Sequence, residues 1–187
     1  MKTRYLLHPV ARLVVAAAAL FVSVSCGGDL LRTGRSPVYL TINSIAGTVS
    51  PVRSDVNPAV PTNDVATASV SVVVKNAAVA ATALNAVTLT RYRVTYVRAD
   101  GRNTPGTDVP YGFDGGLSST IAAGGTSLVT FEVVRLQAKL EPPLKNMTSQ
   151  GGLIYLNTIA QVTFYGRDQN GNEITASGNL DIVFGDF

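Results

Sequence analysis

Apolar and polar residues alternate with a period of two along most of the chain after residue 37, which is the pattern of half-buried β-strands. The first such run places Val38, Leu40 and Ile42 on one face of an expected strand. Turn residues such as Asn170 and Gly171 separate the runs. The pattern predicts about seven strands, at residues 38–43, 70–75, 87–98, 117–121, 129–138, 154–166 and 180–184.

The run 87–98 changes face partway along. Val87 and Leu89 share one parity, whereas Tyr92 and Tyr96 share the other. A β-bulge inserts one extra residue into a strand and so exchanges its two faces. We therefore expect a bulge near Thr90–Arg91, which returns both sets of side chains to the core.

Short strands at this spacing, with no helix between them, predict an all-β fold and an antiparallel β-sandwich. If the strands run alternately up and down, successive connections lie at opposite ends. The long connections 46–64, 99–116 and 139–153 then share one end, and the first strand starts at the other. Loops longer than about 12 residues are uncommon in a compact domain unless they are functional or disordered.

The N-terminal segment has a different pattern. Ten consecutive apolar residues at 13–22 lie behind three basic residues and lead to the single cysteine, Cys26. This arrangement is typical of an export signal. The apolar run is shorter than the roughly 20 residues that a helix needs to cross the hydrocarbon core. We expect residues 1–25 to be a signal peptide that is removed.

The residues at the end of this segment, Val24-Ser25-Cys26-Gly27, resemble the lipobox of bacterial lipoproteins. The resemblance implies that Cys26 is acylated, with palmitate among the acyl chains, and becomes the first residue of a membrane-anchored protein. Residues 26–37 would then be a lipid-anchored tether, and 38–187 a β-sandwich domain.

Two positions of the motif affect this interpretation. Ser23 stands where the lipobox usually has a bulky aliphatic residue, and ordinary cleavage after Ser25 is the competing interpretation because Ser23 and Ser25 fit the small-x-small rule. Gly27, rather than Asp, resembles the outer-membrane case of the enterobacterial sorting rule. We therefore expect the outer membrane or the cell surface rather than the inner membrane.

Removal of the leader changes the charge and the available chemistry. The whole chain has 15 Lys and Arg against 12 Asp and Glu, and loss of Lys2, Arg4 and Arg12 leaves 12 of each. Because the basic excess is lost, the main argument for nucleic-acid binding is lost as well. His8, the only histidine, leaves as well. With Cys26 acylated, Cys/His zinc sites and His-based catalysis are excluded, and no cofactor is expected.

The stretches YRVTYVRADG and AQVTFYGRDQNGNEI resemble strand and hairpin segments of immunoglobulin-like and fibronectin type III-like modules on bacterial surface proteins. They also resemble a group of bacterial lipoproteins that carry a domain of this kind. The resemblance implies an immunoglobulin-like β-sandwich. The antibody-type cysteine pair and central tryptophan are absent.

One metal candidate follows from spacing. Asp168, Asn170 and Asn172 have the D-x-N-x-N spacing of a calcium loop, in which alternate oxygens converge on one cation. Gly171 occupies the fourth position instead of the sixth, and Asn179 the twelfth instead of Glu. A plain hairpin turn is the favoured interpretation, so no metal site is expected.

Two further clusters have a functional and a structural interpretation. Arg91, Arg93 and Arg98 could line an anionic groove, but a solvated outer face opposite the buried tyrosines is the simpler interpretation. Glu132 and Glu141 could be the paired carboxylates of a glycosidase. Nothing in the sequence brings them together, so no catalytic residue is assigned and the chain is not expected to be an enzyme.

Two functional hypotheses follow. The first is a lipid-anchored binding or structural module of the cell envelope, which presents its long loops away from the membrane to another envelope protein or a surface polymer. Its partner-binding candidates are Tyr111, Phe113, Asp114 and Met147. The alternative is a carbohydrate-binding domain or weak glycan hydrolase. Its aromatic platforms would be Tyr39, Tyr111 and Tyr155, since the chain has no tryptophan.

Overall fold

The computed structural model describes residues 34–57, 59, 62–148 and 154–187. The chain divides into two units, 1–35 and 36–187, and nearly all described residues belong to the second. The predicted signal peptide and Cys26 lie outside the described residues, as does most of the predicted tether. The fold described below is that of the second unit.

The second unit is all-β, which confirms the fold class predicted from the alternation. In the described residues there are eight strands: β1 (Val38–Gly47), β2 (Val52–Asp55), β3 (Asp64–Val74), β4 (Val87–Val97), β5 (Phe113–Ile121), β6 (Thr126–Val134), β7 (Leu156–Asp168) and β8 (Glu173–Gly185). The other elements are η1 (Ala83–Asn85), α3 (Leu136–Lys139) and η2 (Leu144–Met147). In the described part of the chain, no helix is long and apolar enough to cross a membrane.

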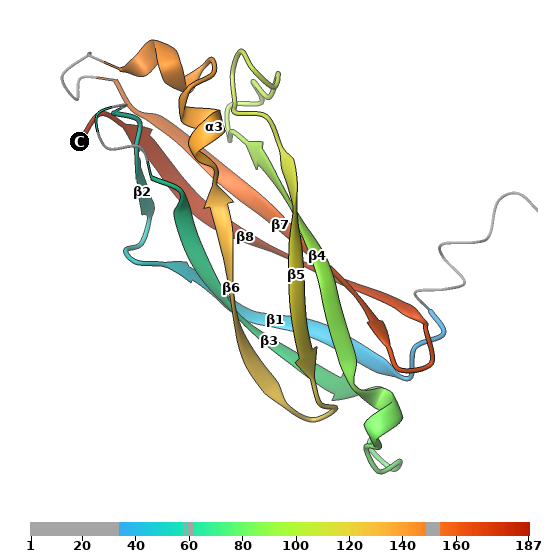
Figure 1. Ribbon diagram of the computed structural model, residues 1–187. Coiled ribbons are helices and arrows are strands. Elements are labelled where there is room, and N and C mark those ends of the chain that lie inside the picture. Colours follow the sequence, from blue (N-terminus) through green and yellow to red (C-terminus); the bar gives the residue numbers. More distant parts are fainter. Residues whose placement is uncertain (1–33, 58, 60–61, 149–153) are drawn as a thin grey trace, which may run out of the picture. The chain divides into compact units, whose positions relative to one another are not determined.

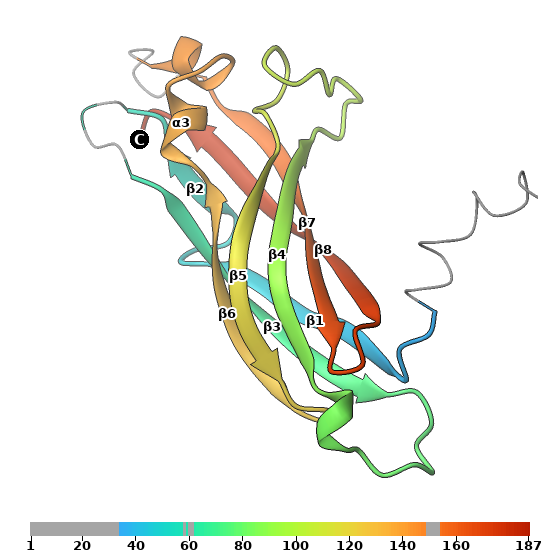
Figure 2. The same cartoon turned by 45° about the vertical axis from the view of Figure 1, so that its right-hand side comes forward.

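The strands form two sheets that face each other (Figures 1 and 2). Sheet A has the order β1-β3-β6, and sheet B has the order β2-β8-β7-β4-β5. All pairings are antiparallel except that of β2 with β8, which is parallel. The chain therefore passes from sheet A to sheet B between β1 and β2.

Strand β2 is the main difference from the predicted elements. It lies inside the expected loop 46–64, which is rich in proline. Pro51 directly precedes β2, a position where proline is tolerated because it removes no ladder hydrogen bond within the strand. The alternation extends over only four residues, of which Val52 and Ser54 are buried, so it gives a weak periodic signal.

The predicted bulge in β4 is confirmed. The register of β4 with both β5 and β7 shifts between Leu89 and Arg91. As a result Val87 and Leu89 are fully buried, and Tyr92 and Tyr96 are each only 4% exposed. The extra residue thus keeps one face of the strand in the core along its whole length.

The centre of the core is an aromatic cluster that joins the two sheets. Phe131 of sheet A lies 5.2 Å, between ring centroids, from both Tyr92 and Phe164 of sheet B, in edge-to-face geometry. Such pairs add to the stabilisation from buried area. The Tyr92 hydroxyl also accepts a hydrogen bond from the Glu132 amide at 3.2 Å.

A second tyrosine crosses the core nearby. The Tyr96 hydroxyl donates to the Val133 carbonyl oxygen at 2.7 Å. Burial, reinforced by the negative charge of Asp64, raises the pKa of Tyr96 above its usual value. The hydroxyl therefore remains a donor at neutral pH, and the buried carbonyl keeps its partner.

The two ends of the domain differ, as predicted. Val38 pairs with Val74, so β1 starts at the end where β3 finishes. The described parts of the segments 56–63, 98–112 and 135–155 lie together at the opposite end, here called the long-loop end (Figure 1). Helices α3 and η2 lie within the third of these segments.

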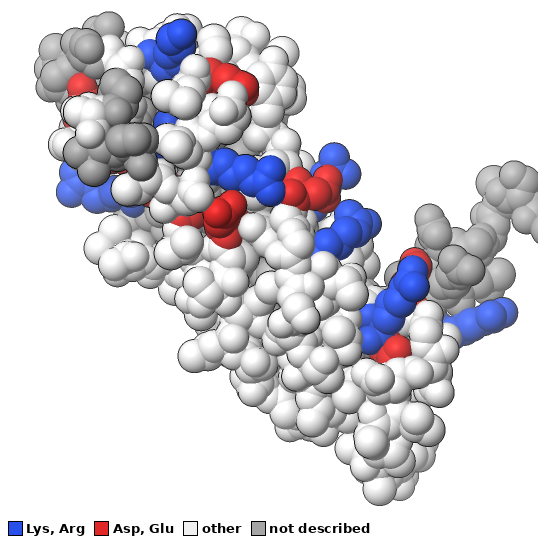
Figure 3. Space-filling model, viewed as in Figure 1, with Lys and Arg blue, Asp and Glu red and all other residues white. Residues whose placement is uncertain are grey.

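Charge is distributed unevenly over the surface. Figure 3 shows Lys, Arg, Asp and Glu at the long-loop end and in a band that continues to the end where β1 starts, whereas the surface around the β5–β6 turn carries none. The sequence agrees, because residues 117–131 contain no charged residue. The β5–β6 turn therefore offers no charged side chain to a partner.

We expect Phe164→Ala to destabilise the domain by about 3–5 kcal/mol, because Phe164 is fully buried in the aromatic cluster. Equilibrium denaturation by urea measures this difference. Gln161→Ala, on the exposed face of the same strand, is the matched control and should change stability by less than about 0.5 kcal/mol. Equal effects of the two substitutions would contradict the assigned register of β7.

Candidate functional site

The predicted partner-binding residues differ in accessibility. The Tyr111 side chain is 53% exposed, whereas Phe113 is half-buried. The Arg135 guanidinium lies 4.1 Å from the centre of the Phe113 ring, and Arg135 Nη2 donates to the Asp114 carbonyl oxygen at 2.6 Å. Tyr111 is therefore the aromatic residue of this pair that a partner can reach.

Asp114 and Met147 also differ from the expectation of free surface residues. The Asp114 carboxylate forms an ion pair with Arg91 at 3.2 Å. Met147 is only 6% exposed, and it belongs to the hydrophobic core together with the neighbouring Leu144. The prediction of Met147 as a surface contact is therefore wrong, because η2 turns both apolar side chains inward.

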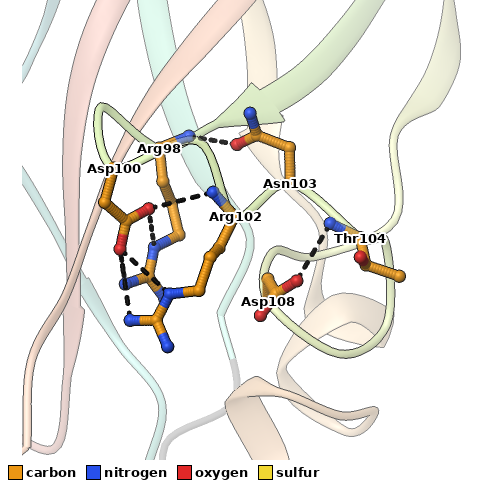
Figure 4. A network of polar contacts seen from close by, with 6 residues as sticks. All are labelled: Arg98, Asp100, Arg102, Asn103, Thr104 and Asp108. Carbon is orange, nitrogen blue, oxygen red and sulfur yellow. Dashed lines mark hydrogen bonds and ion pairs between the residues drawn. The ribbon is translucent and has the colours of Figure 1, made fainter.

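The loop 98–112 is held by its own polar contacts (Figure 4). The Asp100 carboxylate accepts hydrogen bonds from Arg98 Nε at 3.0 Å and from Arg102 Nε at 3.2 Å. Hydrogen bonds from Arg98 and Arg102 lower the pKa of Asp100 to about 2. Asp100 is therefore ionised at neutral pH, where it holds both arginines. The Asn103 side-chain oxygen also accepts a hydrogen bond from the Arg98 amide at 2.6 Å, which fixes the first turn of the loop.

The second half of the loop folds back on itself. The Thr104 amide donates to Asp108, and the Gly106 amide donates to the Val109 carbonyl oxygen at 2.8 Å. Gly106 has a φ of 79°, and a Cβ atom there would lie 2.2 Å from the Tyr111 hydroxyl. Val109 is 1% exposed and attaches the loop to the core. Tyr111 is therefore presented by an ordered loop.

Two hollows adjoin at the start of this loop. The larger, of about 400 Å³, is lined by Ser50, Pro51, Ala99, Asn157, Thr158, Ile159, Asp181, Ile182 and Val183. The smaller, of about 270 Å³, is lined by Arg98, Ala99, Asp100, Tyr155, Leu156 and Asn157. Ala99 and Asn157 belong to both, so the hollows form one continuous depression at the edge of the long-loop end.

Aromatic side chains stack beside the smaller hollow. The Tyr155 and Phe187 rings are 5.6 Å apart between centroids and nearly parallel, at 29°. The Arg53 guanidinium lies 4.1 Å from the centre of the Phe187 ring. Tyr155 is 54% exposed and offers a flat aromatic surface to a ligand.

The three arginines proposed for an anionic groove do not line the same hollow. Arg91 and Arg93 are exposed on the outer face of sheet B, opposite Tyr92 and Tyr96. Arg91 also stacks over a ring of the neighbouring strand, 3.7 Å from the Tyr165 centroid. Arg98 belongs to the loop network instead. The arrangement agrees with the solvated outer face predicted for Arg91 and Arg93.

Glu132 and Glu141 are held by different partners. Glu132 accepts from Asn63 Nδ2 at 2.8 Å and lies 3.6 Å from the Arg135 Nε atom. Glu141 accepts from Gln137 Nε2 at 2.6 Å. Among the described residues, the two carboxylates therefore have separate hydrogen-bond partners.

The calcium candidate forms a hairpin turn between β7 and β8. Asp168 Oδ1 accepts from the backbone amides of Asn170 and Asn172 at 3.0 and 2.9 Å, and Oδ2 accepts from Asn172 Nδ2 at 2.8 Å. Gly171 has a φ of 82°, which suits the predicted turn. Within the described residues, no group of three or more His, Cys, Asp or Glu could hold a metal ion.

A buried ion pair at the long-loop end was not foreseen from the sequence. Lys139 of α3 is 3% exposed, and its Nζ atom lies 3.1 Å from Asp64 Oδ2. The Ser54 hydroxyl of β2 donates to the same carboxylate at 2.5 Å. These three residues connect α3, β2 and β3. A lysine in a four-residue helix gives no periodic signal of burial, so only the tertiary structure identifies the pair.

The sequence also does not predict the depression that contains Asp181. The alternation of Leu180, Ile182 and Phe184 places Asp181 on the outer face of β8, which the sequence indicates. The hollow itself is formed by the 48–51 connection and by Ala99, which are distant in sequence. Alternation identifies the exposed face but not the concave part of it.

Comparisons with known proteins identify no family. No family model matches the chain, and no curated protein matches it. An X-ray structure from the Northeast Structural Genomics Consortium has a TM-score of 0.39 and 10% identity, with 78% of this chain and 86% of that chain covered. The solution structure of a late embryogenesis abundant protein has a TM-score of 0.42 and 12% identity, with 94% and 83% covered. Similarity of this size defines neither a family nor a function.

The hydrogen bonds of Asp168 predict a pH dependence of stability. Burial raises the pKa of this carboxyl, but donors from Asn172, Ser36 and Asn170 outweigh burial and lower the pKa overall. A lowered folded pKa contributes stability above the unfolded value of about 3.9, and this stability is lost as the pH falls through the folded pKa. Asp168→Asn should cost about 1.5–3 kcal/mol at pH 7.

The difference between wild type and Asp168→Asn should shrink as the pH falls below about 4, when measured by urea denaturation at a series of pH values. Gln169→Ala, a neutral change in the same turn, is the control and should show a difference that does not vary with pH. A cost of Asp168→Asn that stays constant from pH 7 to about pH 2 would contradict a role for the ionised carboxylate.

Proposed function

We propose that this chain is a lipid-anchored protein of the bacterial cell envelope, whose domain binds another envelope protein or a surface polymer through its long-loop end. The observation that carries the proposal is the presentation of Tyr111. This tyrosine is 53% exposed on a loop fixed by internal hydrogen bonds, at the end opposite the start of β1.

The orientation follows from where the chain enters the domain. Val38 lies at the end remote from the long loops, because it pairs with Val74. A tether that begins at an acylated Cys26 would enter the domain there. The long-loop end would then face away from the membrane, where a partner can approach it. An ordered loop also supports binding, since little conformational entropy is lost when a partner docks.

The domain itself is proposed to be an immunoglobulin-like sandwich. Support comes from the strand order, since the constant-type immunoglobulin fold places the first, second, fourth and fifth strands in one sheet and the third, sixth and seventh in the other. If β1 and β2 are two halves of one first strand, sheet A contains the first, second and fifth strands. Sheet B contains the third, sixth and seventh, and it also contains the fourth, β5, which pairs with β4 at the sheet edge instead of joining sheet A.

Carbohydrate binding is a second candidate, favoured by one observation. Tyr155 is 54% exposed and lines a hollow together with Asp100 and Asn157, which is the combination of an aromatic platform and polar groups that sugars require. A glycan array tests it. Saturable binding to one sugar class that is lost in Tyr155→Ala, but not in Tyr39→Ala, would favour this candidate over the first.

The anchor predicts a simple biochemical behaviour. The protein from its native host should partition into the detergent phase, and Cys26→Ser should release it or stall its processing, because acyl chains stabilise membrane residence by about 0.8 kcal/mol per buried methylene. The intact mass of the mature protein checks the same point. A chain that begins at residue 26 without added lipid mass would contradict the anchor.

The docking end predicts site-specific crosslinking. A photoreactive amino acid at position 111 should capture the partner in whole cells, whereas the same group at position 39 should not. Tyr39 is a matched control, because it is 56% exposed, also a tyrosine, and lies at the start of β1 at the other end. Capture from position 39 with none from position 111 would show that the partner binds the opposite end.

A further inference from the structure

The larger hollow is an amphipathic groove on the outer face of sheet B. Its apolar surface comes from Pro51 of the β1–β2 connection and from the half-buried Ile159 and Val183 of β7 and β8. Asp181 stands beside Ile159, its direct neighbour across the β7–β8 pairing. The groove thus combines an aliphatic surface with one carboxylate.

Asp181 has no partner within the described structure, whereas other outer-face carboxylates of sheet B do. Asp114 is paired with Arg91, and Glu173 with Arg167 at 2.9 Å. No hydrogen bond or ion pair of the described residues reaches the Asp181 carboxylate. The arginine of the adjacent strand β2, Arg53, is stacked on an aromatic ring instead. Asp181 is therefore the one charged side chain among the residues that line the larger hollow, and no described residue pairs with it.

Asn157 occupies the point where the two hollows meet. Its side chain is exposed and makes no hydrogen bond to the described residues. A carboxamide carries both a donor and an acceptor, as a peptide group does. Beyond it the smaller hollow continues to the exposed ring of Tyr155. A ligand that follows the depression would meet a carboxylate, an aliphatic surface, an amide and an aromatic ring in that order.

We propose that this groove binds a lysine side chain carried by an extended peptide segment of a partner protein. The ammonium group of the lysine meets Asp181, and its four methylenes lie along Ile159 and Pro51, since lysine buries its stem on apolar surface while its charge stays near water. Asn157 bonds the peptide backbone of the segment. The site lies apart from Tyr111 and does not rest on the lipid anchor.

Fluorescence anisotropy with the full chain tests this assignment. The probe is a labelled peptide with the sequence Ser-Val-Lys-Val-Ser, and its isostere has norleucine, which keeps the stem and lacks the charge. Wild type should bind the lysine peptide saturably and the norleucine peptide about two- to fivefold more weakly, because fivefold is the upper limit expected for a solvent-accessible ion pair. Asp181→Asn should bind both peptides equally.

Glu173→Gln is the matched control, because it removes a carboxylate from the same face of the same strand at the far end of β8. It should leave the affinity for the lysine peptide unchanged. Asp181→Lys should lose the lysine peptide and gain a peptide with glutamate in its place. Thermal denaturation of each variant ensures that the comparison is made on folded protein.

Three outcomes would overturn the proposal. The first is equal affinity of wild type for the lysine and norleucine peptides, and the second is no saturable binding of the lysine peptide at all. The third is saturable binding of a chitosan oligosaccharide, but not of the lysine peptide, with loss in Asp181→Asn. That result would assign the carboxylate to an amino sugar polymer instead of a protein.

Discussion

The domain depends on the contact of aromatic rings between its two sheets. The only cysteine of the chain lies at position 26, before the domain, so no disulfide joins the sheets. The edge-to-face contacts of Phe131 with Tyr92 and Phe164, together with the hydrogen bond from Tyr96 to Val133, make that connection instead. Each tyrosine combines buried area with a satisfied hydroxyl, which fixes the position of one sheet on the other. The loops at the ends are therefore attached to a rigid frame.

Buried side chains also fix the segments at the long-loop end. Val109 attaches the 98–112 loop to the core, and Leu144 and Met147 do the same for the segment after β6. Asp64 and Lys139 add a buried ion pair that connects α3 to the sheets. A buried pair of this kind is weak evidence for stability, but it does favour one geometry, because either charge alone would be costly to bury. The surface that we propose for binding is thus shaped before any partner arrives.

The sequence was sufficient for features that depend on local alternation. The bulge between Leu89 and Arg91, the exposed position of Arg93 and the hairpin at Gly171 all follow from side-chain parity or turn chemistry. Features that depend on contacts between distant segments could not be predicted. Met147 is buried because the 3-10 helix η2 packs it against the hydrophobic core. The hollow at Asp181 exists because Ser50 and Pro51 of the β1–β2 connection lie beside sheet B. The site is therefore less predictable than the fold.

Arg135 covers one end of the exposed edge of sheet B. Strand β5 is at the edge of sheet B, and the residues near its start include Phe113 and Asp114. An open edge of this kind can pair with another chain and lead to aggregation. Arg135 covers the Phe113 ring and occupies the Asp114 carbonyl oxygen, so one end of the edge is closed to a second strand by a charged side chain. A neighbouring copy would meet a guanidinium at that position instead of an unpaired carbonyl oxygen.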